Sequence, residues 1–173
     1  MVTEKYLGQL KDTIVHKKLV LDSAYLMAAY LFNNGRTKIA LNLLRRASMH
    51  DNSKFYKGEL VHLVQIYDNA KPAFKDPSVS LSETEASAIQ CHWHNNKHHP
   101  EHFDSPEKMS ELDILEMVCD WHARSVQFGT DLLNFVTVRQ EERFKFPDKM
   151  FSKIYRYCEI ILDEEKKSLE KFE

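Results

Sequence analysis

Residues 37–51 read TKIALNLLRRASMHD, and the fold prediction starts from this stretch. Ile39, Leu43 and Leu44 recur at positions i, i+4 and i+5, so they share one face of a helix. This helix leads the chain directly into the adjacent pair His50–Asp51. Two side chains with affinity for metal ions therefore stand at the end of a helix that we expect to be buried.

The rest of the chain follows the same helical period. Only four glycines and five prolines occur in 173 residues, and apolar residues recur every three or four positions, not every second one. We therefore predict an all-α fold, a compact helical bundle that forms one domain over residues 1–173. The expected helices span 3–21, 22–33, 37–48, 57–70, 81–96, 109–128, 130–143 and 148–171, and the last of them is highly charged.

Capping patterns and prolines mark several helix ends. Ser80 with Glu83, and Ser110 with Asp113, fit the S/T-x-x-[DE] pattern, in which side-chain oxygens bind the free N–H groups of a first helical turn. These pairs are expected to open the fifth and sixth helices. Prolines interrupt the segments between, so loops are predicted at 69–77 and 97–106.

Composition restricts the compartment and the partners. The formal net charge is -2 with mixed signs, so we expect no obligatory nucleic-acid polymer as partner. Three widely spaced cysteines without a CxxC pair indicate a reducing compartment. The chain has neither an apolar signal segment nor a run of about 18 apolar residues, so we expect a cytoplasmic protein without a membrane partner. Four aromatic residues belong either to the core or to a homodimer surface: Phe146, Phe151, Tyr155 and Tyr157.

Metal-binding side chains recur far apart in the chain. His16 precedes the His50–Asp51 pair, and Asp120 follows it, so that three predicted helices contribute to the set. Two neutral imidazoles and two carboxylates suit Mn²⁺, Fe²⁺, Co²⁺, Ni²⁺ or Zn²⁺, and four ligands leave positions for water and substrate. An adjacent His-Asp pair is a weak signal by itself. Lys54 strengthens it, because a lysine within one turn of the pair can bind a phosphate oxygen.

The order of His16, His50-Asp51-x-x-Lys54 and Asp120 resembles the HD superfamily of metal-dependent phosphohydrolases, over about residues 12–125. The strings HDNSKF (50–55), HWHNNKHHPEH (92–102) and EMVCDW (116–121) also resemble a family of small bacterial and phage proteins with the pattern HDxSKF, HxxxNxHHPE and EMxxDW. The resemblance implies an HD-type helical domain in a bacterial or phage-infected cell. It implies that His16, His50, Asp51 and Asp120 bind metal and that Asp51 and Lys54 take part in catalysis.

The histidines from 92 to 99 extend this ligand set. His92 and Asn96 share a helical face, and His98 and His99 follow at the turn, so His92 can converge with one or both of them. In two-metal members of the superfamily, such histidines hold a second ion and the HD aspartate bridges the two. We therefore predict one or two ions, with His92, His98 and His99 as further ligands. The alternative is that His98 and His99 bind substrate phosphate or cap a helix.

Residues near the predicted ligands receive supporting roles. Cationic and amide side chains can bind an anionic substrate, and carboxylates can orient a ligating histidine through its second ring nitrogen. An i, i+4 salt bridge explains Arg124 equally well, and Glu101 can equally stabilise its own loop. The predicted substrate-binding residues are Lys54, Asn96, Arg46 and Arg124, and the predicted orienting carboxylates are Glu101 and Glu116.

Three functions are compatible with these residues. The favoured one is hydrolysis of a small phosphate ester, expected to be a nucleotide, by metal-activated water. The second uses the same scaffold as a di-iron oxygenase, as some HD-fold proteins do. The third is a metal- or nucleotide-binding protein without catalysis. Bound iron with O₂ consumption indicates the second, and tight binding without turnover indicates the third.

Overall fold

The computed structural model describes residues 2–56, 59–60, 63–64 and 83–170, and over these ranges the chain is an all-α bundle without a β-strand. The predicted fold class is confirmed. Shorter turns connect the helices, and several of them carry residues of the candidate site. The α-helices are α1 (Val2–Asn33), α2 (Thr37–Ser48), α5 (Glu83–Asn95), α6 (Glu111–Phe128), α7 (Leu132–Arg139) and α8 (Asp148–Leu169). The 3₁₀ turns are η1 (Asn52–Phe55), η2 (Pro100–His102) and η3 (Pro106–Lys108), and η4 (Gln140–Phe144) is a π turn.

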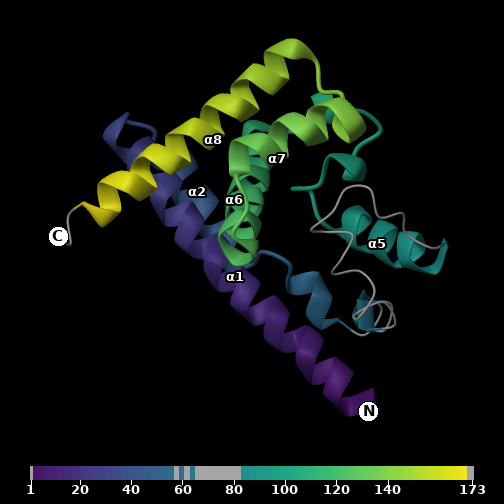
Figure 1. Ribbon diagram of the computed structural model, residues 1–173. Helices are drawn as coiled ribbons and strands as arrows, with labels where there is room; N and C mark the ends of the chain where they lie inside the picture. Colours follow the sequence, from purple (N-terminus) through teal and green to yellow (C-terminus); the bar gives the residue numbers. More distant parts are fainter. Residues whose placement is uncertain (1, 57–58, 61–62, 65–82, 171–173) are drawn as a thin grey trace.

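Helix α6 lies at the centre of the bundle, in contact with α1, α2, α7 and α8 (Figure 1). Twelve of its 18 residues are buried, and they cover nearly the whole circumference of the helix. Most of the twelve are apolar, but Asp113, Glu116 and Asp120 are buried as well. A buried carboxylate is costly without a partner, so these three side chains point to an organised polar site inside the bundle.

Helix α1 supplies the longest wall of the core. Val20, Ala24, Met27 and Leu31 are fully buried, and their spacing of three and four residues places them on one face. This face packs against α6, and α1 also contacts α2 and α8. Helix α5 lies apart from α1 and α8 (Figure 1), and its main contacts are with η1 and η2.

A capping box begins α6, and a glycine ends it. The Ser110 hydroxyl accepts a hydrogen bond from the Asp113 backbone N–H, and the Asp113 carboxylate accepts one from the Ser110 backbone N–H, which is the predicted capping box. Gly129 ends the helix at φ 65°, a conformation that glycine adopts without a Cβ clash. The other predicted capping pair involves Ser80, which lies outside the described residues. The predicted loop 69–77 and most of the predicted helix 57–70 lie outside them too.

One predicted boundary is wrong. Helices 3–21 and 22–33 form one continuous helix, α1, and the Ser23 hydroxyl donates to the Leu19 carbonyl at 2.8 Å within it. The predicted helix 130–143 corresponds to α7, which ends at Arg139, and to the π turn η4 that follows it. There the Gln140 side chain exchanges two 2.8 Å hydrogen bonds with the Phe146 backbone, which closes the turn.

The aromatic residues near the C-terminus contribute to the core. Phe146 and Tyr157 are buried, whereas Phe151 and Tyr155 are half-buried and pack against the same core. The core alternative therefore fits all four, and the homodimer stays a prediction. Among the described residues, no helix combines the length and the apolar character needed to cross a membrane.

Candidate metal centre

The His50–Asp51 pair lies in a tight turn between α2 and η1. Asp51 has a φ of 55°, in the left-handed region, where Asp is better tolerated than most residues because its short side chain bonds locally. Lys17 of α1 supports the turn: its Nζ donates to the His50 carbonyl and, at 2.6 Å, to Asn52 Oδ1. This turn directs both side chains of the pair into the bundle.

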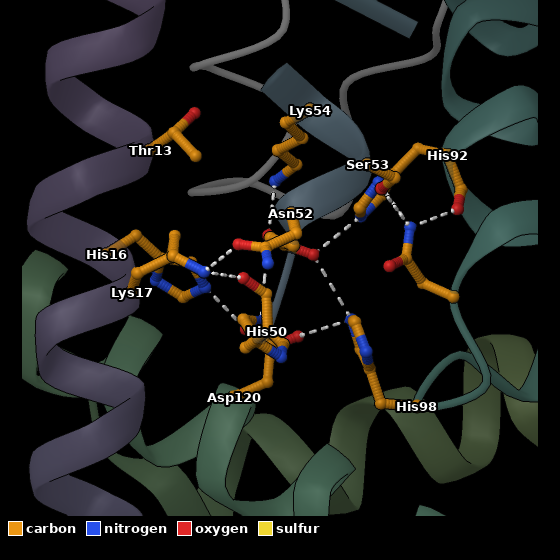
Figure 2. A network of polar contacts seen from close by, with 12 residues as sticks. Thr13, His16, Lys17, His50, Asn52, Ser53, Lys54, His92, His98 and Asp120 are labelled. Atoms are coloured by element: carbon orange, nitrogen blue, oxygen red, sulfur yellow. Dashed lines mark hydrogen bonds and ion pairs between the residues drawn. The ribbon is translucent and has the colours of Figure 1, made fainter. Parts of the chain in front are cut away.

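The predicted metal ligands converge from five parts of the chain, namely α1, the turn after α2, α5, the loop after it, and α6 (Figure 2). All are buried except His99, which is half-buried. Their ligand atoms form three overlapping groups in which all atoms lie within 4.8 Å of one another. The groups are His16, His50 and Asp51; His50, His98 and Asp120; and Asp51, His92, His98 and His99.

The two carboxylate oxygens of Asp51 face different neighbours. Oδ2 lies 3.6 Å from His50 Nε2 and 2.6 Å from Lys54 Nζ. Oδ1 lies 3.5 Å from His92 Nε2 and 3.5 Å from His98 Nε2. Asp51 therefore stands between His50 on one side and His92 and His98 on the other.

Carboxylates engage the outer nitrogens of three of these histidines. His50 Nδ1 donates to Glu116 Oε1 at 3.1 Å, and His98 Nδ1 lies 3.6 Å from the same oxygen. His92 Nδ1 donates to Glu59 Oε1 at 2.7 Å. A histidine whose Nδ1 carries the donated proton presents the lone pair of Nε2 on its other side. The inner nitrogens are thus prepared to accept a metal ion.

Several buried polar atoms in this cluster have no hydrogen-bond partner among the described residues. His16 Nε2 and Asp120 Oδ1 are only 2.8 Å apart, yet they lack hydrogen-bond geometry, as expected of two atoms that both face a common point. An unsatisfied buried polar group costs roughly 1–3 kcal/mol. Bound cations would satisfy these groups, so the residues fit a metal centre. The unsatisfied atoms that face the cluster are His16 Nε2, His50 Nε2, Asp51 Oδ1, His98 Nε2 and Asp120 Oδ1.

The pKa values of the cluster favour the protonation states that metals bind. Burial, with help from Arg124, lowers the pKa of His16 to about 3, and burial also lowers the pKa of His92 and His99. These imidazoles are therefore neutral. Burial by itself would raise the pKa of the Asp51 carboxyl, but the nearby His50 and Lys54 hold it well below its usual range.

The pKa values of His50 and Asp120 are shifted by the same neighbouring charges. Burial would raise the pKa of the Asp120 carboxyl, but its contacts with His16 and His50 keep it well below its usual range. Burial would lower the pKa of His50, but Asp51 and Glu116 raise it. A metal ion at His50 Nε2 would therefore compete with a proton for the same lone pair.

A family model described as a family of unknown function (DUF5662) matches residues 5–171. The chain belongs to this family. The match includes every candidate ligand from His16 to Asp120. No curated protein and no solved structure matches the chain. The resemblance to the HD superfamily stays a prediction.

Arg46 pairs with two carboxylates in this DUF5662 protein. Its guanidinium lies 2.5 Å from Asp113 and also contacts Glu116. Both carboxylates are buried on α6. Arg46 thus holds the carboxylate beside His50, and its substrate-binding role stays a prediction.

Glu101, predicted to orient a histidine, instead pairs with Arg143, because the turn η2 directs its partly exposed side chain toward η4. The alternative, that Glu101 stabilises its loop, fits this geometry. Glu116 occupies the predicted orienting position beside His50 and His98.

The other predicted substrate-binding residues lie around the cluster. Lys54 is buried against Asp51, and Arg124 Nε lies 3.9 Å from Asp120 Oδ1, one turn along α6. Asn96 donates to Ser53 Oγ at 2.8 Å and to the His92 carbonyl at 2.8 Å. Asn96 therefore connects α5 to η1.

Sequence reasoning missed two supporting residues of the DUF5662 site. Glu59 is 33 positions from the histidine that it orients, and Lys17 is 33 positions from the carbonyl that it binds. Helical periodicity carries no signal over such separations, so only packing reveals these roles. Of the histidines left out of the ligand set, His94 is exposed and His122 bonds Ser23, whereas His62 lies outside the described residues.

Proposed function

We propose that this protein is a metal-dependent phosphohydrolase of the HD type that acts on a small phosphate ester, most directly a nucleotide. One observation carries the proposal: the two oxygens of the buried Asp51 carboxylate face different imidazoles, Oδ2 that of His50 and Oδ1 those of His92 and His98. This arrangement is typical of a carboxylate shared by two cations.

The ligands divide into two groups around Asp51. His16, His50 and Asp51 would hold one divalent ion, with Asp120 beside His16 and His50, and Asp51 with the three histidines His92, His98 and His99 would hold the other. Such ions lower the pKa of bound water and neutralise charge on a phosphoryl group. The mixture of nitrogen and oxygen donors suits Mn, Fe, Co, Ni or Zn.

The protein's own side chains supply orientation and charge balance. Glu116 and Glu59 fix the tautomers of the ligating histidines. Lys54 compensates part of the negative charge of Asp51, to which its Nζ lies at 2.6 Å. Arg124 adds positive charge beside Asp120. Two cationic side chains at the edge of the cluster favour an anionic substrate, which supports a phosphate ester.

Metal analysis is the first test. We expect the protein purified without chelator to hold about one or two ions per chain. His50→Ala and Asp51→Ala should lose them, because each removes a ligand from the cluster. His94→Ala is the matched control, since His94 is exposed on α5, the same helix that bears His92. The metal-loaded protein should release phosphate from at least one member of a nucleotide panel.

The outcomes separate the candidate functions. Phosphate release that disappears in both ligand variants supports the hydrolase. Iron in the protein with O₂ consumption and no phosphate release supports the oxygenase instead. Tight nucleotide binding without turnover supports a binding protein. If no divalent ion binds under any supplementation, the metal centre itself is wrong.

A further inference from the structure

Helix α5 and η2, residues 83–102, form a histidine arm that carries His92, His98 and His99. Figure 1 shows α5 set apart from α1 and α8, and its main contacts are with η1 and with η2 of the arm itself. The arm must nevertheless bring three imidazoles within a few ångströms of Asp51. Among the described residues, a few side-chain contacts therefore fix the position of the arm.

Arg143 of η4 contacts the arm at two residues. Its guanidinium pairs with Glu101, two residues after His99, and its Cζ lies 4.5 Å from the ring centroid of Trp93, the residue next to His92. The Trp93 and His99 rings are themselves 6.5 Å apart. One side chain thus contacts both the helical and the loop part of the arm.

The turn that bears Arg143 is itself fixed to α6. The Phe144 ring stacks on Trp121 with centroids 5.5 Å apart, and Trp121 directly follows the ligand Asp120. Gln140 closes the π turn through its two hydrogen bonds to Phe146. A π turn shifts the side chains that follow it relative to a regular helix, and such turns are frequent at functional sites.

These contacts connect the two halves of the candidate centre. On one side, Phe144 packs on the residue beside Asp120, a ligand of the first ion. On the other, Arg143 holds the arm that supplies the second ion's three histidines. An exposed ion pair contributes little by itself, but here a cation–π contact with Trp93 adds to it.

We propose that Arg143 is a positioning residue for the second metal ion: it anchors the histidine arm to η4 so that His92, His98 and His99 meet at Asp51. This inference rests on the proposed metal centre. Without the anchor, the arm samples more conformations, and binding the second ion must then restrict them. His16 and Asp120, ligands of the first ion, lie on α1 and α6, outside the arm.

The test compares Arg143→Ala with Arg139→Ala. Arg139 precedes the same turn and lies over Phe135, with its Cζ 5.3 Å from that ring, so it is a matched control. Titration of the metal-free protein with Mn²⁺ should show second-ion affinity weakened on the order of tenfold in Arg143→Ala, with the first ion unchanged. Arg143→Lys, which retains a cation over Trp93, should recover part of the loss.

Hydrogen–deuterium exchange of the metal-free protein tests the position of the arm and requires neither a bound metal nor an activity assay. Arg143→Ala should accelerate amide exchange in residues 83–102 and leave α1 and α6 unchanged. Unchanged exchange with both ions bound normally would overturn the role of Arg143 and leave the metal centre intact. Equal weakening of both ions would indicate general destabilisation and overturn the selective role. If the wild type binds no ion at all, the proposed centre fails and this inference fails with it.

Discussion

Glu116 connects several parts of the candidate centre through one carboxylate. Its Oε1 accepts a hydrogen bond from His50 Nδ1 and lies near His98 Nδ1, and its Oε2 pairs with Arg46. Burial would raise the pKa of this carboxyl, but the two histidines hold it well below its usual range. Glu116 is therefore ionised and orients one histidine from each side of Asp51.

We expect Glu116→Gln to weaken metal binding about 10- to 100-fold, because loss of an orienting partner lowers both the order and the basicity of the ligating imidazoles. Isothermal titration of the metal-free variant with Zn²⁺ measures the effect. Glu159→Gln is the control, since Glu159 is an exposed residue of α8 that pairs with Arg156. Unchanged affinity in Glu116→Gln would contradict the orienting role.

Asp51 combines a ligand position with an unfavourable backbone conformation. Only two non-glycine residues of the described ranges have positive φ, and Asp51 is one of them. Such a conformation costs roughly 1–3 kcal/mol and persists only where the surroundings impose it. Here Lys17 and Lys54 hold the turn on either side, through the His50 carbonyl and through the Asp51 carboxylate.

Among the elements, the first turn of α6 connects most of the bundle. Glu111 pairs with Arg36, which precedes α2, at 2.5 Å, and with Lys153 of α8 at 3.1 Å. It also accepts a hydrogen bond from Tyr157. Burial would raise the pKa of Glu111, but these donors lower it to about 2. The same contact, together with burial, raises the pKa of Tyr157 to about 12.

This network predicts a pH-dependent contribution to stability. The pKa of Glu111 is lower in the folded state than its ordinary 4.5, so its stabilisation is present above pH 4.5 and is lost as pH falls toward 2. Because Glu111 is partly exposed, we expect Glu111→Gln to cost only about 1 kcal/mol at pH 6. Urea unfolding at several pH values should show this difference shrinking toward zero near pH 2. The exposed Glu107→Gln should show no such trend, and a constant Glu111→Gln effect would contradict the assignment.

For the molecule as a whole, the unsatisfied atoms around Asp51 predict strong coupling between metal binding and stability. A ligand that binds only the folded state, present at 100 times its Kd, adds about 2.7 kcal/mol. For a domain of this size, that corresponds to a rise in Tm of about 5–10 °C. Calorimetry with and without Mn²⁺ measures the shift. Asp51→Ala should show none, and an equal Tm for the metal-free and metal-loaded wild type would contradict the prediction.

Much of the fold follows from local pattern. The limits of α2, the start of α8 and the capping box of α6 agree with prediction, because helical periodicity and capping involve residues within four positions of one another. The break predicted within α1 is wrong. Ser23, beside the predicted break, bonds the Leu19 carbonyl of its own helix and also contacts His122 of α6.

Sequence also identifies the residue types of the candidate centre, since imidazoles and carboxylates in this order indicate metal chemistry whatever their spatial arrangement. It cannot identify which side chains face which. Arg46 pairs with Asp113 and Glu116, and Glu101 pairs with Arg143, contacts that the sequence does not indicate. These pairs join residues 42 to 70 positions apart, and only the packing of helices brings them together. The order of residues in the sequence therefore predicts which side chains are candidate ligands. Their orientation, burial and charge balance are decided by tertiary contacts.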